Sequence, residues 1–292
     1  MISNELVSKW KIIEILPRQS DYDTIRISEA CHADLFLGIS PDGLRCLVLK
    51  LPEGFPFDFK SVDGEKLLLT KIIPDNNVVL TLLDSDFRNL FDDLIVSMYN
   101  SVKDMEKVAT YSSIFISTFL KWSQFFDHEN ESRLSKNLIQ GIFGEIIYLK
   151  NLLHDFPATK VNYALESWRG PYDEGHDFVL EERNVEVKTQ TIVNSSVQIT
   201  NEDQLEQREG KGLELAVVIV DQDSVQGLTL SKLVKEVVDI IEGYLGDVTI
   251  LYTALSQKNL GPMNLDDYND ISFKACEIAL FNCLLPEFPR IV

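Results

Sequence analysis

The chain has 292 residues, of which 45% are apolar, enough to bury one large hydrophobic core or two modest ones. Its 46 acidic residues against 27 lysines and arginines give a formal charge of −19, the wrong sign for nucleic-acid binding by long-range attraction alone. No stretch reaches the 18 apolar residues of a membrane span, and residues 1–13 lack a signal peptide's apolar region. We therefore expect a cytoplasmic protein with no membrane partner.

The cysteines show no zinc-binding pattern. None of Cys31, Cys46, Cys276 and Cys283 belongs to a C-x-x-C pair, and only His32 lies beside one of them. This usage is typical of a reducing compartment, without disulfides or structural zinc.

The first hundred residues predict an antiparallel, β-rich domain with a short helix near residues 5–14. Pro41-Asp42-Gly43 and Asp63-Gly64 are turn signals between apolar runs. The expected strands are 34–39, 44–51, 57–62, 66–73 and 78–83. This domain carries no catalytic constellation, and docking to a partner, to DNA or to a neighbouring subunit are its candidate roles.

Two helices are expected next, at 86–105 and 108–126. The apolar residues at helical spacing are Leu90, Leu94, Met98, Val102, Ile114, Phe115, Phe119 and Trp122. The aromatic side chains among them favour a packed core over a base-stacking platform. We place the domain boundary between residues 84 and 106, giving domains 1–105 and 106–292, with the helices bridging the two.

Residues 134–153 predict an amphipathic helix with a carboxylate in its apolar stripe. The stripe consists of Leu134, Leu138, Ile142, Leu149 and Leu152. Glu145 lies within it, which is costly unless a metal, a cation or a hydrogen-bond network compensates the charge. An ion pair with an arginine at the core edge is the alternative. Gly141 and Gly144 flank Glu145, and glycines in a helix interior indicate close approach of another element.

The strings HDFVL (176–180) and VEVK (185–188), separated by the polar residues 181–184, predict a hairpin. We expect Leu180 to pair with Val185, Phe178 with Val187 and Asp177 with Lys188. A turn of two or four residues then places the four apolar side chains on one face and Asp177, Glu186 and Lys188 on the other. Two acids can hold a hard divalent cation, and a lysine can stabilise charge or position a water. A solvated, salt-bridging strand face is the alternative.

Downstream, Gln190 shares the polar face with Lys188. The expected elements are a strand at 196–200, a helix at 201–208, a strand at 213–220, a helix at 230–243, a strand at 248–255, a loop at 257–270 and a strand at 273–284. The chain has no Walker A or G-x-G-x-x-G pattern, so any ATP dependence must come from another protein.

Asp177, Glu186 and Lys188, preceded by the helical Glu145, resemble the signature of the PD-(D/E)XK nuclease superfamily, with His176 where the motif has proline. The element order resembles the α-β-β-β-α-β core of the restriction-endonuclease-like fold. The strings WRG (168–170), EVKT, VQIT, QL and FPRI (288–291) further resemble a family of uncharacterised bacterial proteins, often encoded beside ATPases in phage-defence or restriction cassettes.

The resemblance implies an α/β protein with a restriction-endonuclease-like core, an N-terminal β-rich domain and bridging helices. It also implies a Mg²⁺-dependent DNA endonuclease, for which Mn²⁺ can replace Mg²⁺. Asp177 and Glu186 would bind the metal, with Glu145 contributing directly or through a water. Lys188 would orient the water or stabilise the transition state, and Gln190 would support the site or contact phosphate. We expect His176, on the core side, to be structural.

The expected partners are DNA, a partner ATPase or other defence-system subunit, and a second copy of the chain. Because of the negative net charge, phosphate contacts would depend on a few local cations such as Arg169, Arg183 and Lys188. Two alternatives stay open: a non-cleaving subunit that keeps the fold to bind DNA or a partner, and an enzyme acting on another phosphate ester.

Overall fold

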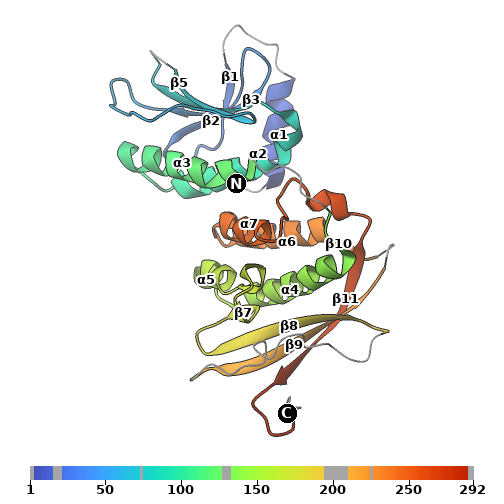
Figure 1. The fold of residues 1–292 in the computed structure, drawn as a ribbon. Helices are drawn as coiled ribbons and strands as arrows, with labels where there is room; N and C mark the ends of the chain where they lie inside the picture. The colour runs from blue at the N-terminus through green and yellow to red at the C-terminus, as the bar shows by residue number, and fades with distance from the viewer. Residues whose placement is uncertain are drawn as a thin grey trace. The chain divides into compact units, whose positions relative to one another are not determined.

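The computed structural model describes residues 3–15, 22–72, 75–126, 133–193, 210–223 and 226–288. The chain divides into two compact units, Met1–Glu129 and Asn130–Val292 (Figure 1). This division lies further along the chain than the sequence-based one, and it assigns both predicted bridging helices to the N-terminal unit.

The N-terminal unit contains a six-stranded sheet in which every strand runs antiparallel to its neighbours, in the order β1-β2-β3-β6-β5-β4. The strands are β1 (Asp23–Arg26), β2 (Asp34–Ile39), β3 (Arg45–Lys50), β4 (Val62–Asp63), β5 (Leu67–Ile72) and β6 (Asn77–Leu82). The prediction of an antiparallel, β-rich unit is confirmed. Strand β1 was not predicted, and of the strand predicted at 57–62 only Val62 belongs to a strand, β4.

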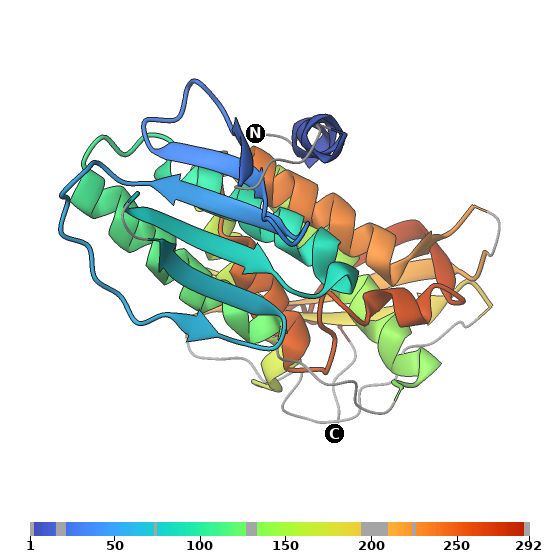
Figure 2. The ribbon, with the colours of Figure 1, turned by 90° about the horizontal axis from the view of Figure 1, so that it is seen from above.

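The described residues of this unit also form the α-helices α1 (Ser3–Glu14), α2 (Arg88–Val102) and α3 (Val108–Ser123). The helices α2 and α3 lie across one face of the sheet (Figure 2). Phe115, Phe119 and Trp122 are fully buried, so the prediction that they form a core is confirmed. The indole Nε1 of Trp122 donates to Ser97 Oγ at 3.1 Å, which ties α3 to α2 and explains why α3 belongs to this unit.

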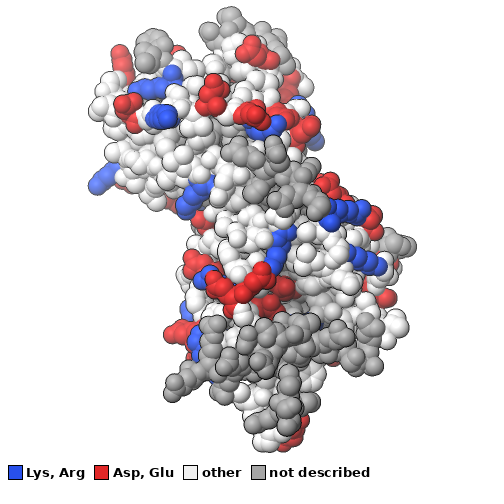
Figure 3. All heavy atoms as spheres, viewed as in Figure 1, with Lys and Arg blue, Asp and Glu red and all other residues white. Residues whose placement is uncertain are grey.

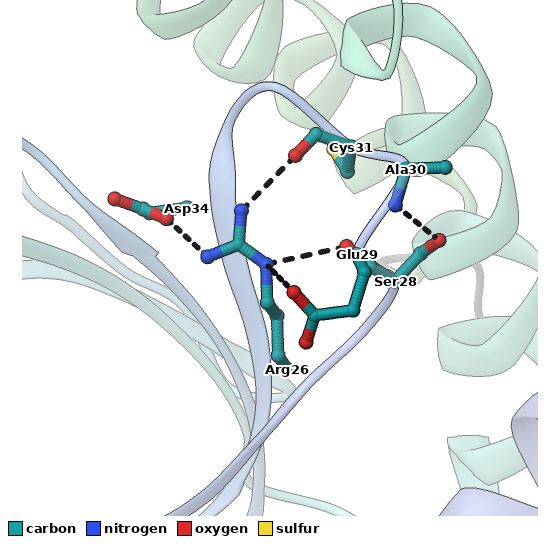
Figure 4. Close-up of polar contacts among 6 residues, drawn as sticks. All are labelled: Arg26, Ser28, Glu29, Ala30, Cys31 and Asp34. Carbon is teal, nitrogen blue, oxygen red and sulfur yellow. Dashed lines mark hydrogen bonds and ion pairs between the residues drawn. The ribbon is translucent and has the colours of Figure 1, made fainter.

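The connection between β1 and β2 is held by one arginine (Figure 4). Arg26 donates from Nη2 to the carbonyl oxygen of Cys31 at 3.0 Å and from Nε to that of Ser28 at 3.3 Å. Its guanidinium also pairs with the carboxylates of Asp34 and Glu29. All of these contacts lie within the connection between β1 and β2 or at the start of β2. We therefore assign Arg26 and its partners a structural role.

The C-terminal unit contains a five-stranded mixed sheet in the order β10-β11-β9-β8-β7. The strands are β7 (Phe178–Val179), β8 (Arg183–Thr191), β9 (Gly212–Asp221), β10 (Leu228–Thr229) and β11 (Ser272–Asn282). The strands β8 and β9 are parallel, and the other neighbours are antiparallel. The mixed α/β class is therefore confirmed. The predicted strand at 196–200 and helix at 201–208 lie outside the described residues, as does most of the FPRI string.

The helices of this unit are α4 (Lys136–Asp155), α5 (Val161–Glu166), α6 (Leu230–Gly243) and α7 (Val248–Ser256). Helix α4 packs on β8 and β9, and α6 packs on α4 (Figure 1). No helix in the described ranges is long and apolar enough to cross a membrane.

The predicted strand at 248–255 is wrong, because this segment is helix α7. Its short apolar run with β-branched residues fits either element by composition. Asp247 caps the helix, since its Oδ1 accepts from the backbone N–H of Thr249 at 3.1 Å. The buried residues Val248, Leu251, Tyr252 and Leu255 follow helical spacing.

Helix α4 approaches the sheet most closely at Gly144. A Cβ at this position would lie 1.8 Å from Thr189 Oγ1, so no side chain fits between α4 and β8. The expected close approach is thus confirmed for Gly144 but not for Gly141, where a Cβ would meet nothing within 4 Å. Leu138, the second residue of the predicted apolar stripe, is exposed, so the stripe prediction is wrong at this position.

Gly144→Ala is therefore expected to destabilise the protein by about 1–3 kcal/mol, the usual cost of overpacking. Gly141→Ala is the matched control and is expected to be neutral or stabilising by up to about 1 kcal/mol, because alanine favours helix. Chemical denaturation of both variants measures these free energies of unfolding. Equal effects at the two positions would contradict the packing described here.

Candidate active site

The hairpin that carries the predicted acids has a two-residue turn, Glu181-Glu182. The N–H of Leu180 donates to the carbonyl oxygen of Arg183 at 2.9 Å, and Phe178 pairs with Val185. The predicted pairing of Leu180 with Val185 and Phe178 with Val187 is therefore wrong by two residues. The predicted faces still hold, because a shift of two residues preserves the alternation of side chains. The side chains of Phe178, Leu180, Val185 and Val187 are all buried.

Asp177 is held at the start of the hairpin by backbone hydrogen bonds. Its Oδ2 accepts from the N–H of Val187 at 2.7 Å, so its carboxylate reaches β8 beside Glu186. Its carbonyl oxygen accepts from the N–H groups of Arg169 and Gly170, at 2.7 and 3.0 Å. The 168–177 loop is thereby fastened to the hairpin.

Glu145 reaches the same place from helix α4. Its Oε2 accepts from the indole Nε1 of Trp168 at 2.7 Å, rather than from an arginine. A Cβ on Gly170 would lie 2.3 Å from Glu145 Oε2 and 2.8 Å from Asp177 Oδ1. Both carboxylates therefore border the space that a side chain at position 170 would fill. The sequence pointed to Trp168 and Gly170 only as part of a resemblance, without a role.

Glu186 is the most deeply buried of the three acids, with 1% of its surface exposed. Its Oε1 accepts from Lys188 Nζ at 2.6 Å. Its Oε2 is buried and has no hydrogen-bond partner among the residues that the structure describes. An unpaired, buried carboxylate oxygen is costly, and a bound cation would remove that cost.

Burial raises the pKa values of all three carboxyls, and for Glu145 and Glu186 the neighbouring carboxylates add to this effect. Burial, followed by the charge of Asp177, raises the pKa of Glu145 to about 8 and that of Glu186 to about 7. Burial also raises the pKa of Asp177, although the hydrogen bond from Val187 and the charges of Lys188 and Lys258 oppose this effect. The cluster therefore retains protons near neutral pH unless a cation enters.

The five predicted site residues, Glu145, Asp177, Glu186, Lys188 and Gln190, all line one pocket of about 870 Å³. His176, which is 3% exposed, is not among the residues that line the pocket, in keeping with the structural role expected for it. The pocket lies entirely within the C-terminal unit, between the α4 helix, the 168–177 loop and β8.

The lysines of the pocket differ in part from the cations that the sequence suggested. Arg183 Nε pairs with Glu214 Oε2 at 3.0 Å, Arg169 Nε lies 3.9 Å from a carboxylate oxygen of Glu174, and neither arginine lines the pocket. Lys136 and Lys258 do line it, together with Lys188. Both lie far from the hairpin in sequence, so no local motif pointed to them.

The acids fit a divalent cation, although they do not form a complete cage. In the part of the chain that the structure describes, no group of three or more His, Cys, Asp or Glu residues could hold a metal ion by itself. Mg²⁺ requires less than this, because it keeps several waters and is bound by one or two carboxylates together with substrate phosphates. Asp177 and Glu186, with the unpaired Oε2 of Glu186, match that requirement. In Figure 3, acidic side chains gather on the surface of this unit near α4 and β7.

The fold and the pocket thus define a mixed α/β protein with an acid-acid-lysine site at a hairpin. Over residues 6–292 the chain matches the model of a family described as "Putative PD-(D/E)XK family member, (DUF4420)", and it belongs to that family. The resemblance to the PD-(D/E)XK superfamily is confirmed by this match. No curated protein and no solved structure matches the chain.

The raised pKa values predict an unusual dependence of stability on pH in the absence of divalent cations. The folded state keeps protons that the unfolded chain loses above about pH 4.5, so stability decreases as pH rises from there towards 8. Each raised pKa unit corresponds to about 1.4 kcal/mol. Glu145→Gln, which keeps an acceptor for Trp168, is expected to flatten this decrease and to be more stable than wild type at pH 8.

Urea denaturation in EDTA between pH 5 and 8.5 measures this effect. Glu166→Gln, at an exposed position outside the pocket, is the control and should follow the wild-type curve. A Glu145→Gln curve parallel to that of wild type would show that Glu145 does not carry the proton.

Proposed function

We propose that the protein is a Mg²⁺-dependent DNA endonuclease. The observation that carries the proposal is the convergence of Glu145, Asp177, Glu186 and Lys188 on one pocket, in a chain of the PD-(D/E)XK family. Asp177 and Glu186 would hold the metal, and Glu145 would contribute directly or through a water. When bound, the cation supplies Lewis acidity, which polarises the scissile phosphate and lowers the pKa of a water.

The chain's own groups set the geometry of the reaction. The Val187 N–H and the Trp168 indole orient the carboxylates of Asp177 and Glu145, and they restrict each to one position. Lys188 is held against Glu186, where its ammonium group can orient the attacking water or stabilise the charge that develops on the phosphate. Gln190 lies further along β8 in the pocket wall, where it would contact a phosphate oxygen.

We infer that the biological setting is a bacterial restriction or phage-defence system in the cytoplasm. The narrower sequence resemblance supports this setting. A net charge of −19 opposes approach to DNA, although screening limits the repulsion to about 8 Å at physiological salt. We therefore expect a partner ATPase, another subunit or a second copy of the chain to supply part of the DNA affinity, with the isolated chain binding weakly.

The second candidate function is a non-cleaving subunit that binds DNA or a partner. The incomplete metal cage and the negative net charge favour it. The buried, uncompensated oxygen of Glu186 favours the enzyme, because a binding subunit gains nothing from that cost.

The proposal predicts Mg²⁺-dependent cutting that requires Glu186 and Lys188. Cleavage of plasmid, linear duplex and single-stranded DNA is expected from wild type with Mg²⁺ and to be lost in Glu186→Gln and Lys188→Ala. Mg²⁺ should raise the melting temperature of wild type more than that of Glu186→Gln, because the metal binds the folded state. Glu214→Gln, which changes a carboxylate of the neighbouring strand outside the pocket, is the control.

Equal stabilisation by Mg²⁺ in wild type and Glu186→Gln would show that Glu186 does not hold the metal. Metal-dependent stabilisation without cleavage of any DNA, with or without cell extract as a source of partners, would favour the non-cleaving subunit.

A further inference from the structure

Lys258 enters the pocket from a segment that is distant in sequence from the hairpin. It follows helix α7, and the next residue, Asn259, has a φ of 56°, in the left-handed region. Lys258 lines the pocket together with Glu145 and Asp177.

The resting partner of Lys258 is Asp173, in the loop that also carries Gly170. Lys258 Nζ lies 2.6 Å from Asp173 Oδ1. The lysine side chain is 20% exposed, whereas the aspartate side chain is 83% exposed. An ion pair with such an exposed member is weak and is easily exchanged for another anion.

Asp173 itself has a backbone conformation that is uncommon for a residue with a side chain. Its φ is 57°, and its N–H donates to the carbonyl oxygen of Gly170 at 3.2 Å. Non-glycine residues in the left-handed region are held there by their surroundings and are frequent at functional sites. Of the two members of the pair, Asp173 has this conformation itself, whereas for Lys258 it is the next residue, Asn259, that has it.

We propose that Lys258 binds a backbone phosphate of the nucleic acid that enters the pocket and exchanges Asp173 for that phosphate. This inference rests on the proposed function. A phosphate approaching three carboxylates needs cations of its own. Lys188 is held by the buried Glu186, and Lys136 is bonded to Gln222 at another part of the wall. Lys258 is the pocket lysine whose partner is a solvent-exposed carboxylate.

A purely structural tie between α7 and the 168–177 loop is the competing explanation, and two variants separate them. Lys258→Met keeps the aliphatic stem but removes the charge, so it weakens DNA binding if Lys258 contacts phosphate. Asp173→Asn breaks the ion pair but leaves the ammonium group in place. A structural tie predicts the same effect for both variants, whereas phosphate binding predicts that Asp173→Asn binds as well as wild type or better.

The experiment is a titration of duplex and single-stranded DNA with the full chain, with Ca²⁺ in place of Mg²⁺, over a series of salt concentrations. Loss of one phosphate contact is expected to reduce the slope of log K against log salt by about 0.9 for duplex and about 0.7 for single strands. Lys258→Met should show this reduction, and Lys258→Arg should restore the slope. The matched control is Lys150→Met, since Lys150 pairs with Glu236 at 2.7 Å outside the pocket.

A wild-type slope in Lys258→Met, or equal losses in Lys258→Met and Asp173→Asn, would overturn the inference while leaving the nuclease proposal intact. Steady-state cleavage with Mg²⁺ adds a second readout, in which Lys258→Met is expected to raise KM more than it lowers kcat. A wild-type protein that neither binds nor cleaves DNA would overturn both proposals.

Discussion

Three carboxylates of the C-terminal unit converge on one pocket, and their burial is the constraint on which the rest of the site depends. Each acid arrives from a different element: Glu145 from helix α4, Asp177 from the start of the hairpin and Glu186 from β8. Each is positioned by a separate donor, so the cluster is preorganised rather than the result of chance proximity. Burial raises the pKa of each of the three carboxyls, so their ionised forms are disfavoured in the folded protein. A bound divalent cation would stabilise the ionised forms.

Two glycines make this arrangement sterically feasible. Gly144 brings α4 into contact with Thr189 of β8, which sets the depth at which Glu145 enters the pocket. Gly170 leaves open the space between Glu145 and Asp177, and its N–H also holds the Asp177 carbonyl. Both glycines act through the absence of a side chain. Substitution of either glycine would therefore displace the carboxylates of the site, although no charged residue is itself replaced.

The net charge and the local charge of the pocket have different consequences. The chain as a whole repels DNA, yet three lysines, Lys136, Lys188 and Lys258, line the wall around the acids. Screening limits the repulsion from distant acids to about 8 Å at physiological salt, so under the proposed function these lysines are the cations that would meet a phosphate in the pocket.

The sequence by itself determined the faces of the hairpin, the buried setting of Glu145 and the family, since side-chain alternation and helical spacing are local properties. The register of Phe178 with Val185 depends on the turn that forms, and side-chain parity is insensitive to an even shift. The α7 helix was missed because a short apolar run fits a strand equally well until its neighbours are known. Only the tertiary structure brought Lys136, Lys258, Trp168 and Gly170 to the acids, because contacts between residues distant in sequence leave no periodic signal in the chain.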